Sequence, residues 1–117
     1  MNSFFVTGTD TDVGKTCVSA SIAKHLRDID VDVGVMKPFA SGYKATLDSV
    51  SEDVKILMKY SGVKDPVDLV NPYYFEIPTS PYDASKQLNL EIDISRVIES
   101  YKQLASIHDI VIVEGIG

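Results

Sequence analysis

One stretch of the sequence decides the fold. Residues 4–16 read FFVTGTDTDVGKT, in which a short apolar run ends at Gly8 and is followed by Gly14, Lys15 and Thr16. The apolar run predicts a strand, and apolar residues at three- and four-residue spacings after Lys15 predict a helix. Glycines between a strand and a helix let backbone N–H groups turn inward around an anion. The stretch therefore predicts a loop that binds phosphate.

The residues after the second glycine fit that prediction. Lys15 is placed to meet the β- and γ-phosphates of a nucleotide, and the Thr16 hydroxyl can join a Mg²⁺ shell. The usual phosphate loop has four residues between its glycines, whereas this one has five, Thr9 to Val13. A glycine-rich turn with an incidental Gly-Lys-Thr is the alternative, and the strand–loop–helix context favours the phosphate loop.

Strands and helices alternate along the rest of the chain. The first helix has one apolar stripe, made of Val18, Ile22, Leu26 and Ile29. Residues 31–36 predict a second strand that Pro38 ends, and residues 38–42 are interpreted as a loop. The run IVIV at residues 110–113 is typical of a central strand buried on both faces. This order predicts an α/β fold, a mostly parallel sheet flanked by helices in three layers. The length fits a single domain over residues 1–117, left incomplete after a central strand.

Three more helices carry end signals. Ser49 and Glu52 have the spacing of a capping box with Ser49 as N-cap, and Gly62 is a plausible stop. Asp93 can cap a later helix, and Ser80-Pro81 can open a short one to about residue 88. Residues 71–81 are interpreted as a structured loop with a short strand. The helix after Asp93 has the most regular apolar stripe, made of Ile94, Val97, Ile98, Tyr101, Leu104 and Ala105.

Two charged residues are expected beside the phosphate loop because each follows a strand. Lys37 comes directly after the second predicted strand, and Glu114 after the run at residues 110–113. Parallel strands bring their carboxyl ends to one edge of the sheet, where ligands bind. A second lysine there would offset triphosphate charge, although a lone lysine after a strand is usually a solvated charge. An acid there can bind Mg²⁺ together with phosphate oxygens.

Asp53 is a candidate second carboxylate for the same metal. It lies in the first turn of the helix predicted after Ser49. Acids are also common in first turns simply because they suit the helix dipole. Both interpretations of Asp53 stay open at this point.

Composition excludes several classes of protein. Eleven Lys and Arg against seventeen Asp and Glu give a net charge of −6, which argues against nucleic acid or an anionic membrane as the main partner. No apolar run reaches the roughly 18 residues of a membrane span. The single cysteine, Cys17, excludes an internal disulfide and fits a reducing cytoplasm. We expect Cys17 to be a small packing residue.

Several segments together resemble the dethiobiotin synthetase family. They are residues 6–16, residues 37–42 (KPFASG), residues 71–73 (NPY), residues 78–81 (PTSP) and residues 113–115 (VEG). Their order and spacing are kept from residue 4 to the last residue, which corresponds to about the first half of the family's usual length.

The resemblance implies a fold like that of the phosphate-loop (P-loop) NTPases and an ATP-dependent ring closure in biotin synthesis. The substrates would be 7,8-diaminononanoate (7,8-diaminopelargonate), CO₂ and ATP. The products would be dethiobiotin, ADP and phosphate, formed through a carbamate and a carbamic-phosphoric anhydride. It also implies Mg²⁺ as cofactor, a homodimer and a cytoplasmic location.

The resemblance further assigns roles to residues. Lys15 and Lys37 would be catalytic, and Ser41 and Thr11 would contact the substrate. Thr16, Asp53 and Glu114 would bind the metal. The residues that would bind ATP are Asp12, Val13, Gly14, Lys15, Thr16, Cys17, Asp53, Glu114, Gly115, Ile116 and Gly117. Asp12 stands where many relatives have Glu, and Ile116 where a smaller Ala is common.

Other functions of a phosphate loop remain possible. A ParA-like switch ATPase would carry a lysine early in the loop, where this chain has Thr9 and Asp10. A cobyrinate-type amide synthetase is closer, but residues 37–42 and 78–81 suit the dethiobiotin family better. The third alternative is a non-catalytic half-domain that needs a partner, because the chain stops at Gly117, directly after its most apolar strand.

Overall fold

The computed structural model describes residues 2–7, 13–41, 51–75 and 92–115. Three strands form its main sheet: β1 (Asn2–Val6), β2 (Val33–Met36) and β5 (Ile110–Glu114). Their order is β1-β5-β2, and both neighbouring pairs are parallel. The strand with the uninterrupted apolar run is therefore the central one, as its sequence predicts.

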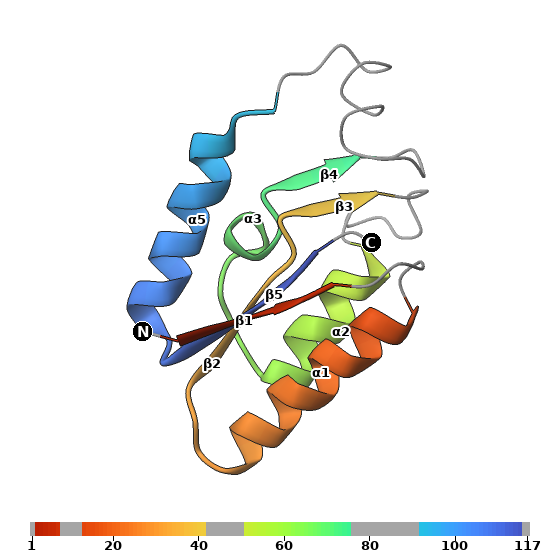
Figure 1. Ribbon diagram of the computed structural model, residues 1–117, viewed down its shortest axis with the longest axis vertical. Helices are drawn as coiled ribbons and strands as arrows, with labels where there is room; N and C mark the ends of the chain where they lie inside the picture. The colour runs from red at the N-terminus through yellow and green to blue at the C-terminus, as the bar shows by residue number, and fades with distance from the viewer. Residues whose placement is uncertain (1, 8–12, 42–50, 76–91, 116–117) are drawn as a thin grey trace.

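Helices cover both faces of this sheet (Figure 1). On one face lie α1 (Val13–Asp28) and α2 (Glu52–Ser61), and on the other lies α5 (Ile94–Ile107). A one-turn helix, α3 (Val67–Val70), follows α2. The predicted α/β class, a parallel sheet flanked by helices in three layers, is confirmed. None of the described helices is long and apolar enough to cross a membrane.

The two helical layers enclose two apolar clusters, one on each face of the sheet. Val33, Val35 and Ile112 pack with Ala23 of α1 and with Val54 and Leu57 of α2. Met36 and Val111 pack with Leu104 and Ala105 of α5. The alternation along β2 and β5 explains this, because successive strand side chains point to opposite faces. By the same alternation Glu114 shares the face of Ile112, which is the face of α1.

A second, smaller sheet corrects one prediction. Residues 38–42 are not simply a loop, since β3 (Phe39–Ser41) pairs in parallel with β4 (Tyr73–Phe75). The last residue of β2 that pairs with the main sheet is Met36, so this pairing ends before Pro38, as predicted. The chain then turns and pairs with β4, which is the short strand expected within residues 71–81.

The helix ends confirm two signals and correct a third. Gly62 ends α2 in the left-handed conformation, with φ of 73°, which glycine adopts without strain. The Asp93 side chain accepts a hydrogen bond from the Ser95 N–H and caps α5. The N-cap of α2 is Ser51 and not Ser49, because the Ser51 hydroxyl accepts from the Val54 N–H. The short helix expected from Ser80-Pro81 lies outside the described residues.

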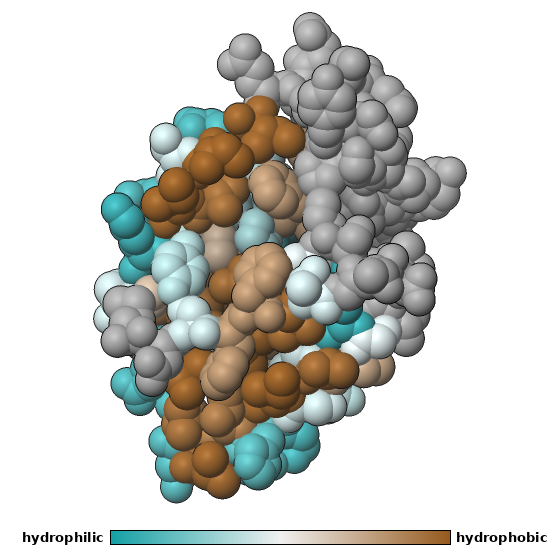
Figure 2. All heavy atoms as spheres, in the orientation of Figure 1, coloured by the Kyte–Doolittle hydropathy of each residue, from teal (hydrophilic) through white to brown (hydrophobic). Residues whose placement is uncertain are grey.

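The predicted apolar stripes are correct only in part. On α1, Val18 and Ile29 are half-exposed, while the alanines Ala20 and Ala23 are buried instead. On α5, Ile94 and Ile98 are also half-exposed, and the remaining predicted members of the stripe pack against the sheet. On α1 the buried line thus includes the alanines, and on α5 it is narrower than the predicted stripe. Figure 2 shows apolar atoms gathered on the surface over the upper part of α5.

Candidate functional site

The carboxyl ends of the three main strands and the start of α1 lie at one edge of the sheet (Figure 1). Three segments meet there: α1 begins a few residues after β1, Lys37 directly follows β2, and Glu114 is the last residue of β5. Parallel topology requires this meeting. The charged residues that the sequence placed at strand ends are therefore neighbours in space.

Glu114 is at the centre of the cluster. Its side chain is fully withdrawn from solvent. Oε1 accepts a 2.8 Å hydrogen bond from the Thr16 hydroxyl, which comes from the first turn of α1. Oε2 is buried and accepts no hydrogen bond from the described residues. A buried carboxylate oxygen without a donor is costly, so Glu114 is poised to take a cation.

Lys37 faces two carboxylates. Its side chain is only 3% exposed, and Nζ lies 3.8 Å from Glu114 Oε2 and 3.8 Å from Asp53 Oδ2. Asp53 projects from the first turn of α2 and is about one quarter exposed. Its position beside Lys37 and Glu114 favours a role at this edge over a purely dipolar one. The 3.8 Å separations leave these contacts looser than direct hydrogen bonds, so the lysine can be drawn toward another anion.

Lys15 completes the positive side of the cluster. It is buried in the first turn of α1. Its Nζ donates a 3.3 Å hydrogen bond to the Gly115 carbonyl, and the Gly115 N–H donates to the Val6 carbonyl at 2.9 Å. The residue after β5 thus links the end of β1 to the lysine of α1. Two lysines, two acids and a hydroxyl face one another across this edge.

The electrostatics favour the binding of a cation beside Glu114. Burial raises the pKa of its carboxyl above the ordinary value of 4.5, and the charge of Asp53 raises that pKa further. Lys37, the Thr16 hydroxyl and Lys15 offset part of the rise. The net rise means that the two lysines and the hydroxyl do not fully compensate the ionised carboxylate for its burial. Bringing a divalent cation close would stabilise the ionised form.

The donors at this edge suit Mg²⁺. Hard oxygen donors are what Mg²⁺ prefers, and it commonly takes one or two carboxylates with phosphate oxygens and water. Glu114 Oε2, Asp53 and the Thr16 hydroxyl are donors of that kind. Within the described part of the chain no three His, Cys, Asp or Glu side chains form a metal cluster. A metal here would need ligands from a bound phosphate or water.

The other predicted site residues are placed as follows. Gly14 lies in the first turn of α1 and Gly115 follows β5, both at this edge. Val13 begins α1 and Ser41 ends β3, but their side chains are outside the description. Thr11, Asp12, Ile116 and Gly117 lie outside the described residues.

Cys17 is not the packing residue that we expect from the sequence. It is exposed and lines a shallow groove between α1 and α2 with Lys24, Ile56 and Tyr60. The reason is the same rotation of α1 that exposes Val18, since the buried positions of this helix are Ser19, Ala20 and Ala23.

Sequence reasoning used Asn71 only as part of the NPY segment and gave it no role at the site. It is buried, and its side-chain amide donates to the Lys37 carbonyl at 2.8 Å. A polar residue placed directly between Val70 and Pro72 is the signal that could have drawn attention to it.

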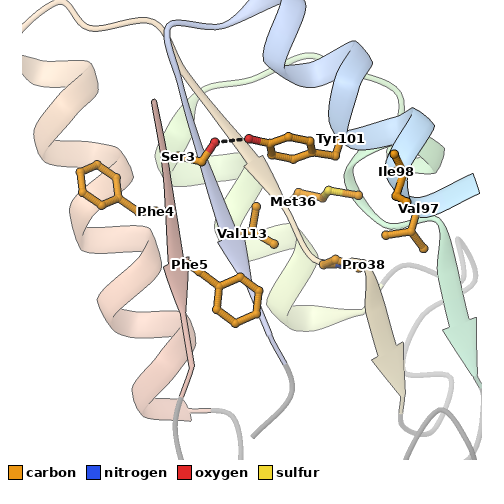
Figure 3. Close-up of a pocket in the computed structure, with 9 residues that line it drawn as sticks. All are labelled: Ser3, Phe4, Phe5, Met36, Pro38, Val97, Ile98, Tyr101 and Val113. Carbon is orange, nitrogen blue, oxygen red and sulfur yellow. Dashed lines mark hydrogen bonds between the residues drawn. The ribbon is translucent and has the colours of Figure 1, made fainter. Parts of the chain in front are cut away.

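A larger hollow lies away from this cluster. It has a volume of about 420 Å³ and lies between β1, the end of β2 and α5. Figure 3 shows the side chains around it, which are mainly apolar and include Phe5, Met36 and Val113. The Ser3 and Tyr101 hydroxyls are hydrogen bonded at one side. With no charged side chain in its lining, the hollow lacks groups suited to phosphate chemistry.

The chain is similar to one known protein family and to several curated proteins. The family model described as "AAA domain" matches residues 2–117. ATP-dependent dethiobiotin synthetase BioD of Nitrosopumilus maritimus is 50% identical over 117 residues, covering all of this chain and 51% of that protein. The synthetase of the same name from Bacillus licheniformis is 38% identical, covering all of this chain and 49% of the relative.

A third relative of that name, from Akkermansia muciniphila, is 37% identical over 118 residues and is covered to 52%. The chain thus spans about half the length of the curated relatives that it matches, and the resemblance to dethiobiotin synthetases is confirmed. The charged strand ends at one edge of a parallel sheet lie within the matched residues. This chain belongs to the AAA domain family.

Proposed function

We propose that the protein is an ATP-dependent dethiobiotin synthetase, a ring-closing ligase of biotin biosynthesis. Its substrates are 7,8-diaminononanoate, CO₂ or bicarbonate, and ATP. The observation that carries the proposal is the meeting of Lys15, Thr16, Lys37 and Glu114 at one sheet edge. The names of the relatives support the use of ATP and dethiobiotin as the product.

The chemistry balances without a protein nucleophile. One substrate amine takes up CO₂ and loses a proton, which gives a carbamate. A carbamate oxygen attacks the γ-phosphorus of ATP, and the bond to the ADP oxygen breaks. The second amine then attacks the carbamoyl carbon, and phosphate leaves with the former carbamate oxygen. The product is the cyclic urea of dethiobiotin.

The protein's task in such a reaction is to position charge. Phosphoryl transfer depends on placement and charge stabilisation more than on covalent help. Lys15 reaches the phosphates from the first turn of α1, and Lys37 reaches them from the end of β2. The described residues of the site include no Ser-His or Cys-His pair, and such a reaction needs none.

Thr16, Asp53 and Glu114 would hold Mg²⁺, which would supply neutralising charge on the phosphate oxygens. In the structure Lys37 lies between the two carboxylates. We infer that it turns toward the phosphate once a divalent ion offsets those acids. Because its contacts with both carboxylates are long, at 3.8 Å, breaking them costs little free energy.

The backbone around residues 12–17 and 114–117 would line the rest of the nucleotide phosphates. Ser41 and Thr11 would contact the diamine or carbamate, since β3 starts from the same edge as Lys37. A homodimer and a cytoplasmic location belong to the same proposal.

The test uses the complete protein. ADP release is measured with ATP and Mg²⁺, adding diaminononanoate and bicarbonate separately and together, and dethiobiotin is identified by mass spectrometry. We expect ADP release only with both additions, in a one-to-one ratio with dethiobiotin. ATP hydrolysis that ignores the diamine and rises with DNA or a protein partner would instead indicate a switch ATPase. Absence of any turnover would indicate a non-catalytic half-domain.

A further inference from the structure

Lys37 lies at the point where the chain leaves the main sheet. The parallel ladder between β2 and β5 ends with the pair Met36 and Val113. Lys37 is nevertheless buried, so its own backbone N–H and C=O groups need partners outside that ladder. The position of its side chain depends on what those partners are.

Both partners come from the junction of α3 and β4. The Lys37 N–H donates to the Val70 carbonyl at 2.7 Å. The Lys37 carbonyl accepts from the Asn71 side-chain Nδ2 at 2.8 Å. Two consecutive residues therefore hold the backbone of Lys37 on its N–H and C=O sides.

Asn71 is itself firmly held. It is only 7% exposed, its N–H donates to the Val67 carbonyl at 2.7 Å, and its Nδ2 also donates to the Tyr73 carbonyl at 2.9 Å. The Tyr73 N–H in turn donates to the Pro38 carbonyl at 3.1 Å. The Asn71 side-chain nitrogen, which has two N–H donors, thus binds the carbonyl of Lys37, which precedes β3, and the carbonyl of Tyr73, the first residue of β4.

We propose that Asn71 is a positioning residue for Lys37, setting where its ammonium lies relative to Glu114 and Asp53; the proposal rests on the proposed function. Only a side chain with two donors on one short stem satisfies both carbonyls. Aspartate of the same shape would face those carbonyls with acceptor oxygens. Alanine would remove the donor to the buried Lys37 carbonyl and one donor to the part-buried Tyr73 carbonyl, and a buried group left unsatisfied costs about 1–3 kcal/mol.

The first experiment measures kinetics in Asn71→Ala and Asn71→Ser of the complete protein. A misplacement of about 1 Å can cost on the order of 100-fold in rate, so we expect kcat to fall about 10- to 100-fold in Asn71→Ala. Serine keeps one donor, so kcat of Asn71→Ser should fall less. KM for ATP should change less than about threefold, because Lys15 and the start of α1 are untouched.

Ser61→Ala is the matched control. Ser61 is also buried and donates to a backbone carbonyl, that of Leu57 at 2.7 Å, but it lies at the other end of α2. Its loss should reduce the free energy of unfolding without lowering kcat. Equal losses of kcat in Asn71→Ala and Ser61→Ala would overturn the proposal.

A double-mutant cycle separates positioning from general stability. In a Lys37→Met background, Asn71→Ala should lower kcat no further, because the group that it positions is gone. Full additivity of the two losses would refute the proposal. Wild-type protein that fails to make dethiobiotin would contradict the proposed function and not this inference.

Hydrogen exchange provides a readout that needs no activity. The Lys37 amide is protected by the Val70 carbonyl, and in Asn71→Ala or Asn71→Ser its exchange should accelerate at least about tenfold relative to the amides of β5. Unchanged protection of Lys37 in both variants would show that Asn71 does not fix this backbone.

Discussion

Lys37 Nζ and Glu114 Oε2 lie 3.8 Å apart, and both side chains are withdrawn from solvent. They come from the ends of neighbouring parallel strands, so their proximity is a consequence of topology and not of local sequence. The contact pairs a buried base with a buried acid oxygen that accepts no hydrogen bond from the described residues. In the proposed function, an incoming polyanion and its metal ion would replace this contact.

Lys37→Met should abolish most turnover without unfolding the protein. Methionine keeps most of the length and packing of the side chain but removes the charge. Losing one preorganised group that stabilises the transition state costs about 10²–10³ in kcat, and we expect a loss in that range. Steady-state ADP release measures it, with circular dichroism to check the fold.

Lys24→Ala is the control for that variant. Lys24 is exposed on α1, away from the charged cluster, and pairs with Asp28 at 2.7 Å. An exposed pair of this kind contributes little to stability because solvent screens it, and kcat should stay unchanged. Normal turnover in Lys37→Met would remove Lys37 from the site.

Thr16→Val should raise the Mg²⁺ concentration needed for half-maximal turnover. Valine has the shape of threonine but cannot donate to Glu114 Oε1 or bind a metal. Removing a group that orients a metal ligand typically costs about 10- to 100-fold in affinity, and a Mg²⁺ titration of ADP release measures the change. Thr16→Ser keeps the hydroxyl and should stay within a few-fold of wild type. Equal Mg²⁺ requirements in the two variants would exclude the hydroxyl from the metal site.

His108 should give the folded protein a pH-dependent stability. Its Nδ1 lies 2.7 Å from Asp32 Oδ1 and its Nε2 lies 2.6 Å from Asp65 Oδ2. Burial lowers the pKa of His108, but its bonds to Asp32 and Asp65 outweigh burial and raise that pKa above 6.5. A group with a raised folded pKa contributes stability that is full below its unfolded pKa and is lost as pH rises through the folded pKa.

Urea unfolding at several pH values tests this expectation. His108→Ala should lower the free energy of unfolding by about 1–3 kcal/mol below pH 6, near the lower end because Asp32 is more than half exposed. The deficit should shrink as the pH passes above the raised pKa. His25→Ala, which removes an exposed histidine of α1, is the control. A deficit for His108→Ala that is the same at every pH would mean that folding does not change the pKa of this imidazole.

Gly34→Ala should destabilise the protein through the same imidazole. A Cβ at residue 34 would come 2.5 Å from His108 Cδ2, and the two bonds to Asp32 and Asp65 hold that ring in place. Overpacking of this kind costs about 1–3 kcal/mol, measured by urea unfolding. The double variant Gly34→Ala/His108→Ala should lose less than the sum of the single losses. Strict additivity would mean that the methyl group finds space without moving the ring.

The sequence was sufficient for the parallel sheet and for most of the charged cluster. Strand ends in a parallel sheet share an edge, so Lys15, Lys37 and Glu114 could be brought together from element order alone. The position of Asp53 could not, because the first turn of a helix suits an acid whether or not a site lies nearby. The position of Asp53 depends on how α2 packs beside β2.

Other features depend on contacts that periodicity does not encode. Val18 and Ile98 fit an apolar stripe but are about half-exposed, since only the packing of each helix on the sheet decides which part of its stripe is covered. The pairing of β3 with β4 joins residues more than thirty positions apart, and Pro38 conceals it by ending the first ladder. Asn71 acts through its side-chain amide on a distant backbone, which no spacing rule reveals.

The most direct test asks whether a nucleotide and its metal ion bind where the ends of the three main strands meet. Mn²⁺ in complex with an ATP analogue that resists hydrolysis is added to isotope-labelled complete protein, and paramagnetic broadening of backbone amide signals is recorded. We predict strong broadening at Thr16, Lys37, Asp53 and Glu114, with His108 and Asp32 at the opposite edge of the sheet unaffected. Broadening centred on the apolar hollow beside Phe5, or spread evenly over the protein, would contradict a nucleotide site at these strand ends.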